Sequence, residues 1–148
     1  MRKLGPLVLA GTLAIGGTAQ ADYVLHILHI NDLHSRIEPV NKYNATCSED
    51  DQAADECFGG VARLATLLNE TRDRLEAEGA NVITLDAGDQ FQGSLIYTTY
   101  KGRAAAEFMT EIGFDVMAAG NHEFDDGPVN FADFIAQVPF PVISGNLD

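Results

Sequence analysis

Residues 114–125 read Phe-Asp-Val-Met-Ala-Ala-Gly-Asn-His-Glu-Phe-Asp, an apolar run typical of a buried strand that leads directly into a polar hexapeptide. Two earlier strand-like runs end in the same way, one at Asp32-Leu33-His34 and the other at Gly88-Asp89. These strand ends supply Asp, His and Asn side chains, which are ligands suited to a divalent metal. Open α/β sheets place their sites where the carboxyl ends of the strands meet. The pattern therefore predicts a metal-dependent hydrolase.

The rest of the chain alternates between strand-like and helix-like patterns. Buried strands are expected at 23–30, 81–85, 115–119 and 140–143. Apolar residues at three- and four-residue steps predict amphipathic helices over 61–75, 105–112 and from Pro128 onward, the last with Phe131, Phe134 and Ile135 on its apolar face. This β-α-β-α-β-α-β order predicts an α/β fold with a parallel sheet and right-handed crossovers. A polar connection over 31–58 is unusually long, which favours a functional loop.

The first 21 residues have the pattern of a secretory signal peptide. Arg2 and Lys3 precede an apolar run over 4–15, and Ala19-Gln20-Ala21 forms a small-residue cleavage site. The run is short for a membrane anchor. We expect a protein exported to the periplasm or the extracellular space, with no stable membrane insertion after cleavage. The chain stops directly after a strand, so residues 22–148 are expected to be the N-terminal portion of a truncated domain.

The chain is acidic, with 22 acidic and nine basic residues and a formal net charge of −13. Loss of the predicted signal peptide would remove Arg2 and Lys3 but no acid, which changes the charge to −15. Nucleic-acid polymers are bound through Lys and Arg on phosphates, so this balance argues against them as partners. A small anionic substrate would need positive charge from metals or from another segment.

Two cysteines, Cys47 and Cys57, lie in the long polar connection. Zinc sites usually present Cys pairs two to four residues apart with further ligands of similar type, and this pair has neither. In an exported protein a disulfide is the favoured alternative. Closing so short a loop would stabilise the fold by about 2–3 kcal/mol.

The three strand-end motifs together resemble a known family. Asp32-x-His34 and Gly88-Asp89 are weak signals separately, whereas Gly120-Asn121-His122-Glu123 is much more specific. Residues 25–35, 88–94 and 120–125 resemble successive signatures of the 5′-nucleotidases. Ala119 departs from the larger aliphatic residue that this family prefers before the glycine. The resemblance runs from about residue 23 to the end and implies the first part of a calcineurin-like metallophosphoesterase domain, with its layers of sheet and helices incomplete.

The resemblance implies a centre for two divalent ions, which could be Zn, Mn, Mg, Co or Ca. Asp32 and His34 would bind the first ion, Asp89 would bridge both, and Asn121 would bind the second. Such a pair can activate a water and stabilise the oxyanions of a phosphoryl displacement. The family's remaining ligands, two His and a Gln-containing segment, would come from beyond this chain, as would a C-terminal nucleotide-binding domain.

The resemblance also implies a catalytic pair, His122 and Asp125. His122 would face the phosphate and stabilise the transition state, and Asp125 would orient its ring and favour the imidazolium form. The neighbouring candidates have simpler interpretations. His26 and His29 read as packing residues of a strand, and Asp86 as a hydrogen-bonding group near the site. Glu123 reads as a residue behind the metal ligands.

These observations predict an exported two-metal phosphoester hydrolase with a small-molecule nucleotide as its substrate. The leading activity is that of a 5′-nucleotidase, which converts nucleoside monophosphates to nucleosides and phosphate, with nucleotide sugars or 2′,3′-cyclic nucleotides as further substrates. Two alternatives stay open. One is a family member that acts on another ester, such as a thiosulfohydrolase, and the other is a non-catalytic fragment or binding module.

Overall fold

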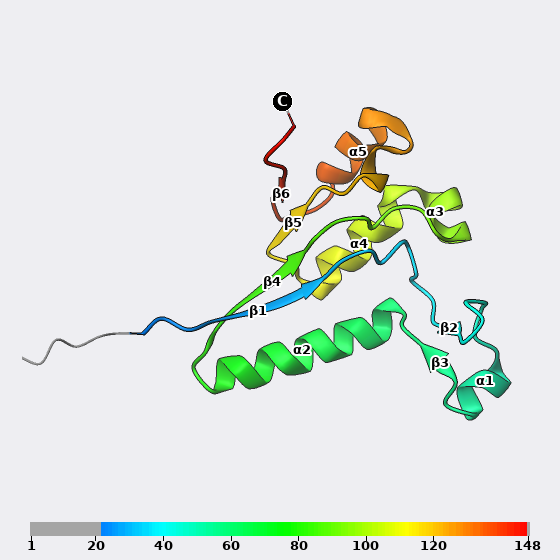
Figure 1. The fold of residues 1–148 in the computed structure, drawn as a ribbon, viewed down its shortest axis with the longest axis horizontal. Helices are drawn as coiled ribbons and strands as arrows, with labels where there is room; N and C mark the ends of the chain where they lie inside the picture. The colour runs from blue at the N-terminus through cyan, green and yellow to red at the C-terminus, as the bar shows by residue number, and fades with distance from the viewer. Residues whose placement is uncertain (1–21, 148) are drawn as a thin grey trace, which may run out of the picture.

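The computed structural model describes residues 22–147, so the predicted signal peptide, residues 1–21, lies outside the described part of the chain. Its centre is a parallel sheet in the order β1 (Leu25–Ile30), β4 (Asn81–Asp86), β5 (Val116–Ala118) and β6 (Val142–Ile143) (Figure 1). The four predicted strands all form, and they pair in the order in which they follow one another along the chain. This confirms an α/β fold of the β-α-β-α-β-α-β type.

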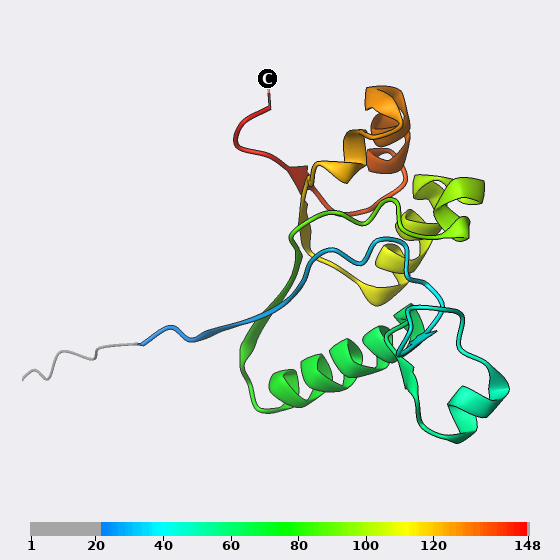
Figure 2. The same cartoon turned by 45° about the vertical axis from the view of Figure 1, so that its right-hand side comes forward.

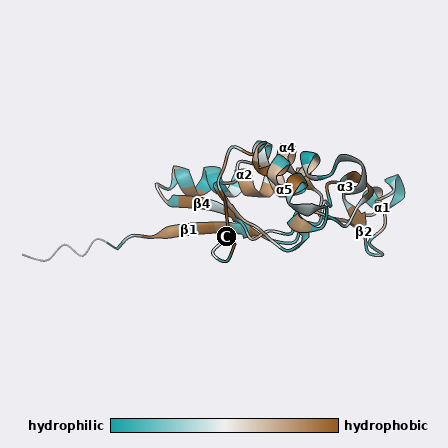
Figure 3. Cartoon of the chain, turned by 90° about the horizontal axis from the view of Figure 1, so that it is seen from above, coloured by the Kyte–Doolittle hydropathy of each residue, from teal (hydrophilic) through white to brown (hydrophobic). Residues whose placement is uncertain are grey.

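The helices α2 (Val61–Ala77), α4 (Gly102–Ile112) and α5 (Gly127–Ile135) lie along one side of this sheet (Figure 3). Their apolar side chains meet those of the strands in a single core cluster. Its buried members are Leu68, Phe91, Tyr97, Ala105, Ala106, Met109, Ile112, Phe114, Met117, Phe131, Phe134 and Phe140. Ile135, predicted on the apolar face of α5, is 41% exposed because it is the last residue of that helix.

A short helix that the sequence did not predict, α3 (Leu95–Tyr100), precedes α4. Its residues are largely β-branched or aromatic, types with low helix propensity, so local pattern favours no helix here. The Ser94 hydroxyl caps it by accepting from the Tyr97 N–H at 3.4 Å. The Tyr97 ring is buried against Phe91, with the ring centroids 5.1 Å apart. Tertiary packing therefore outweighs propensity in α3.

The long connection predicted over 31–58 is more ordered than a loop. It contains the antiparallel pair β2 (Val40–Asn41) and β3 (Cys57–Phe58), and a short helix, α1 (Glu49–Ala53). Cys47 and Cys57 form the predicted disulfide, with their Cα atoms 5.8 Å apart. In both Figure 1 and Figure 2 this unit lies beside the start of α2, away from β6. The disulfide and the strand pair both join residues within the excursion and therefore stabilise it internally.

The expectation that the first strand is buried is wrong for one of its faces. Leu25 and Ile27 are 43% and 54% exposed, and His29 on the same face is exposed as well. β1 is an outer strand of the described sheet, and the helices lie only on the opposite face, where His26 is half-buried. Its Leu and Ile side chains nevertheless lie on both faces, a pattern typical of a strand covered on both sides. Within residues 22–147, no helix combines the length and apolar character needed to cross a bilayer.

Candidate metal centre

The carboxyl ends of β1, β4 and β5 lie side by side because of the register of the parallel sheet. Ile30 at the end of β1 pairs with Asp86, and Asp86 in turn pairs with Met117 of β5. Beyond the strands, the loops remain bonded to each other. The Asp32 N–H donates to the carbonyl of Gly88 at 2.9 Å, and the His34 N–H donates to the carbonyl of Asp89 at 3.1 Å. The predicted motifs therefore meet at one edge of the sheet.

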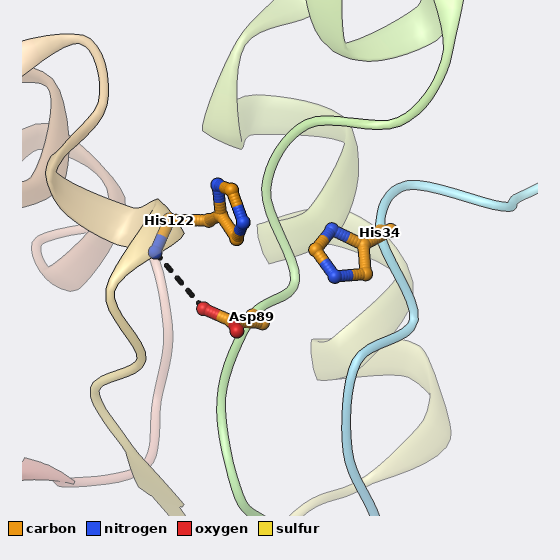
Figure 4. A group of neighbouring side chains, drawn as sticks. All are labelled: His34, Asp89 and His122. Atoms are coloured by element: carbon orange, nitrogen blue, oxygen red, sulfur yellow. Dashed lines mark hydrogen bonds between the residues drawn. The ribbon is translucent and has the colours of Figure 1, made fainter.

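Three side chains from these three loops converge, namely His34, Asp89 and His122 (Figure 4). Each offers one ligand atom, and these atoms lie within 4.8 Å of one another. The rings of His34 and His122 meet edge to face, with their centroids 5.0 Å apart. Imidazole nitrogens and carboxylate oxygens at this spacing form a donor set suited to a divalent transition metal. His122 was predicted as a catalytic group rather than a ligand, and here it faces the same space as the two predicted ligands, His34 and Asp89.

The His34 ring is oriented by a backbone carbonyl. Its Nδ1 lies 3.0 Å from the carbonyl oxygen of Phe91, so Nδ1 carries the proton and donates it. In the neutral ring this leaves Nε2 as the nitrogen with a free lone pair, which is the arrangement common to metal-binding histidines. Nε2 lies 3.5 Å from Oδ1 of Asp32. The loop geometry therefore leaves Nε2 of His34 as the nitrogen that is available to a metal ion.

The other two predicted ligands lie at the margin of this cluster. The Asp32 side chain is 53% exposed, and a hydrogen bond from the Asn31 amide holds the pKa of its carboxyl below the ordinary value. Asp32 is therefore an anion near His34 at neutral pH. Asn121 is exposed and directly precedes the 3₁₀ turn His122–Phe124. The described cluster brings together His34 and Asp89, with Asp32 beside His34 and Asn121 in the adjoining loop.

His122 and Asp125 form a close pair across one turn of the chain. Nδ1 of His122 lies 2.7 Å from Oδ2 of Asp125. This hydrogen bond, together with the negative charges of Asp125, Asp89 and Glu123, raises the pKa of His122 above its ordinary value. The pairing orients the ring and favours its protonated form. Both effects are those expected of an acid beside a catalytic histidine.

The loops approach each other so closely that glycine is required at two positions. Gly88 has φ +94°, and a Cβ there would lie 2.5 Å from the backbone nitrogen of Gly120. A Cβ on Gly120 would lie 2.5 Å from the backbone nitrogen of Asp89. Both distances are well below van der Waals contact, so no side chain fits between the loops. Asp89 itself adopts φ 57° in this turn.

Buried polar groups lie beneath the cluster, and the sequence revealed little of their arrangement. Asp86 is 2% exposed, and burial raises the pKa of its carboxyl to about 7. Its Oδ1 accepts from Nε2 of the buried Gln90 at 2.9 Å, so Asp86 is the hydrogen-bonding group that was expected. Glu123 is fully buried and bonds to several backbone N–H groups. In the sequence, the only local indication of this role was the position of Glu123, an acid that directly follows the Asn121-His122 pair.

The comparison with known proteins identifies the family to which this fold belongs. Residues 25–147 match the model of the calcineurin-like phosphoesterase family, and the chain belongs to that family.

Within this family, the chain is similar to 5′-nucleotidases. The chain is 44% identical over 139 residues to the 5′-nucleotidase of Bos taurus and 39% identical over 145 residues to a snake venom 5′-nucleotidase of Gloydius brevicauda. These alignments cover 91% and 95% of this chain. The crystal structure of a 5′-nucleotidase precursor from Thermus thermophilus matches with a TM-score of 0.67 and 40% identity, over 84% of this chain and 22% of that one. The predicted resemblance to 5′-nucleotidases is confirmed.

The chain spans about a quarter of the length of these relatives, since the alignments cover 23% of each curated sequence. The shared part is the one that contains the three strand-end loops.

Proposed function

We propose that the protein carrying this chain is an exported phosphoester hydrolase that uses two divalent metal ions and acts on nucleoside 5′-monophosphates. The observation that carries the proposal is the convergence of His34, Asp89 and His122 from three strand-end loops. The similarity to 5′-nucleotidases supports the substrate class. The similarity to a venom protein and the sequence pattern of residues 1–21 support export.

The residues present fit a metal centre by their chemistry. Asp32 and His34 would hold the first ion, Asp89 would be shared between the ions, and Asn121 would hold the second with a neutral oxygen. Two carboxylates, an imidazole and an amide form a mixed donor set that several divalent metals accept. When bound, the ions would supply Lewis acidity and an activated water. Further ligands would come from residues outside this chain.

His122 would act on the phosphoryl group directly. With Nδ1 committed to Asp125 at 2.7 Å, its Nε2 side is the one that can donate to a phosphate oxygen. Asp125 stabilises the imidazolium form, so the donor carries positive charge where negative charge develops in the transition state. In an acidic chain such as this one, that charge is otherwise scarce. His122 is therefore assigned to transition-state stabilisation and Asp125 to its orientation.

We also propose a domain assignment, which the similarity to longer 5′-nucleotidases supports. Residues 1–21 would be the signal peptide, and residues 22–148 would be the N-terminal portion of the metallophosphoesterase domain. The rest of that domain and a C-terminal nucleotide-binding domain would complete the protein. The 148-residue chain expressed alone should therefore bind metal weakly and show little hydrolysis. Robust nucleotide turnover by the purified chain, free of contaminating enzyme, would contradict this assignment.

The activity itself is tested by a release screen on the full-length protein. Chromatography would measure the products in each case with Mn²⁺ or Zn²⁺. These are nucleoside and phosphate from nucleoside monophosphates, nucleoside monophosphate and sugar phosphate from nucleotide sugars, nucleoside monophosphate from 2′,3′-cyclic nucleotides, and sulfate from a thiosulfonate ester. The proposal expects nucleoside 5′-monophosphates to give the highest kcat/KM. A preference for the sulfur ester would favour the thiosulfohydrolase alternative, and no turnover of any ester would favour a binding module.

A further inference from the structure

Glu123 is an acid with no exposed surface, although it directly follows a half-exposed histidine. Its carboxylate is saturated by backbone donors from two separate loops. Oε2 accepts from the N–H of Asp89 at 3.0 Å and from the N–H of Gly120 at 2.6 Å. Oε1 accepts from the N–H of Gln90 at 2.8 Å and from the N–H of Phe91 at 3.3 Å. One side chain therefore bonds four backbone amides.

This arrangement explains how a charged group is tolerated in the interior. Successive N–H groups of a left-handed turn point into one concavity, and such a concavity favours an anion. The turn here begins at Asp89, whose φ is 57°. A buried carboxylate is stable when its oxygens are saturated by hydrogen bonds, as they are in this site. The backbone of the 89–91 turn and the charge of Glu123 therefore stabilise each other.

Hydrogen bonds connect Glu123 and its neighbour His122 to Asp89, the proposed bridging ligand. Glu123 holds the backbone of Asp89, and the N–H of His122 donates to Oδ1 of Asp89 at 2.9 Å (Figure 4). His122 and Glu123 are neighbours in the chain, so the backbone and the side chain of Asp89 are both bonded to one short segment. Gly88 and Gly120 allow the loops to come close enough for this. Asp89 thus has little freedom to turn away from His34.

We propose that Glu123 is a positioning residue that locks the backbone of Asp89 and the His122 loop into the spacing needed for metal binding. The inference rests on the proposed function, because it concerns the same centre. A buried acid that served stability alone would affect unfolding without affecting metal binding in the folded protein. A positioning residue affects both, since ligand geometry must be held to within about 0.2 Å.

The test compares isosteric variants of the full-length protein. Glu123→Gln keeps the volume but turns one acceptor into a donor. Both oxygens accept, so either orientation of the amide places an NH₂ against two backbone N–H groups. Glu76→Gln is the matched control, since Glu76 is exposed on α2. Leu75→Ala, at a buried position of α2, serves as a variant that lowers stability alone.

Co²⁺ affinity and stoichiometry would be measured in each folded variant by titration, with the thermal midpoint of the metal-free protein recorded in parallel. We expect Glu123→Gln to lower Co²⁺ affinity about 10–100-fold, the range for groups that orient metal ligands. Glu76→Gln and Leu75→Ala should keep the wild-type affinity. Unchanged affinity in Glu123→Gln, or an equal loss in Leu75→Ala, overturns the inference while leaving the proposed function intact. If the wild-type protein binds no Co²⁺, the proposed function falls and the inference falls with it.

A measurement on the wild-type protein covers the case in which Glu123→Gln does not fold. The backbone amides that Glu123 holds should be strongly protected from hydrogen exchange in the metal-free protein, before any ion orders the loops. These amides are those of Asp89, Gln90, Phe91 and Gly120. Exchange at the rates of an open loop would show that the lock is absent and would overturn the inference. The milder Glu123→Asp, shorter by one methylene, should raise the exchange of all four.

Discussion

The close approach of the Gly120 and Asp89 loops leads to a sharp prediction about a single methyl group. Gly120 does not have a positive φ, so alanine is compatible with its backbone, and Gly120→Ala adds only volume. The added Cβ would overlap Oδ1 of Asp89 and lie 2.5 Å from its backbone nitrogen and 2.8 Å from its Cγ. A backbone nitrogen cannot rotate away as the end of a flexible side chain can. The loops must therefore separate.

The size of the effect follows from these distances. Ordinary contact begins at 3.4 Å, so the 89–91 turn has to move by about 1 Å. Overpacking of this kind costs about 1–3 kcal/mol of stability. Because ligand positions tolerate only about 0.2 Å, the same movement should lower metal affinity at least tenfold. Stability and metal affinity are thus expected to fall together.

The assay is urea unfolding of the metal-free full-length protein, combined with competition for Mn²⁺ against a chelator. Gly145→Ala is the matched control, because a Cβ at Gly145 would meet nothing within 4 Å and Gly145 likewise lacks a positive φ. Gly145→Ala should change neither quantity by more than the error. If Gly120→Ala is as stable as Gly145→Ala and binds Mn²⁺ equally well, the loops are not packed as described and the reasoning is refuted.

Three further predictions concern other parts of the site and its support. Asp89→Asn should lower the metal content of the full-length protein, whereas His122→Ala should keep the metals and lower kcat about 10²–10⁴-fold. Metal analysis of both purified variants tests this, and the opposite pattern would reverse the two roles. Burial raises the pKa of Asp86 from 3.8 to about 7, so the folded state holds this proton more tightly, and stability is lost as pH rises from about 4 through 7. Asp86→Asn should therefore stabilise the metal-free protein by up to about 4 kcal/mol at pH 8 and by less than about 1 kcal/mol at pH 4; a difference independent of pH in urea unfolding would argue against a buried charge. Replacing Cys47 and Cys57 by Ser should lower the free energy of unfolding by about 2–3 kcal/mol and speed proteolysis between the two positions, with unchanged Mn²⁺ affinity. A loss of Mn²⁺ binding would mean that the disulfide supports the site as well.

Much of the site could be predicted because its residues follow strands that are visible in the sequence. The runs before Asp32 and before Gly120 are apolar and short, and strands of a parallel sheet end at one edge. The sequence pattern therefore places His34 and Asp89 together, and the structure brings their ligand atoms close to those of His122. The pair His122 and Asp125 is three residues apart and needs only a local turn.

Other features could not be predicted because they depend on partners distant in sequence. The helix α3 forms where Tyr97 packs on Phe91, although its own residues disfavour a helix. The exposure of Leu25 and Ile27 depends on which face of the sheet the helices cover. The sequence of the strand does not indicate which face that is. Three of the four backbone bonds of Glu123 reach groups 32–34 residues away, and every residue except proline offers the same backbone N–H, so the sequence does not indicate these partners.

The sequence by itself determined the order of strands and helices, the types of ligand and the strand ends that carry them. These are local properties, set by hydrophobic periodicity and by residue type over short stretches. Only the tertiary structure decided how near the loops lie, which nitrogen of His34 is free, and why no side chain fits at Gly88 and Gly120. It also decided which backbone groups Glu123 bonds. The physical reason is that these properties arise from the register of the sheet and from close packing between distant segments. A displacement of about 1 Å is enough to turn a binding site into a group of residues that are merely neighbours.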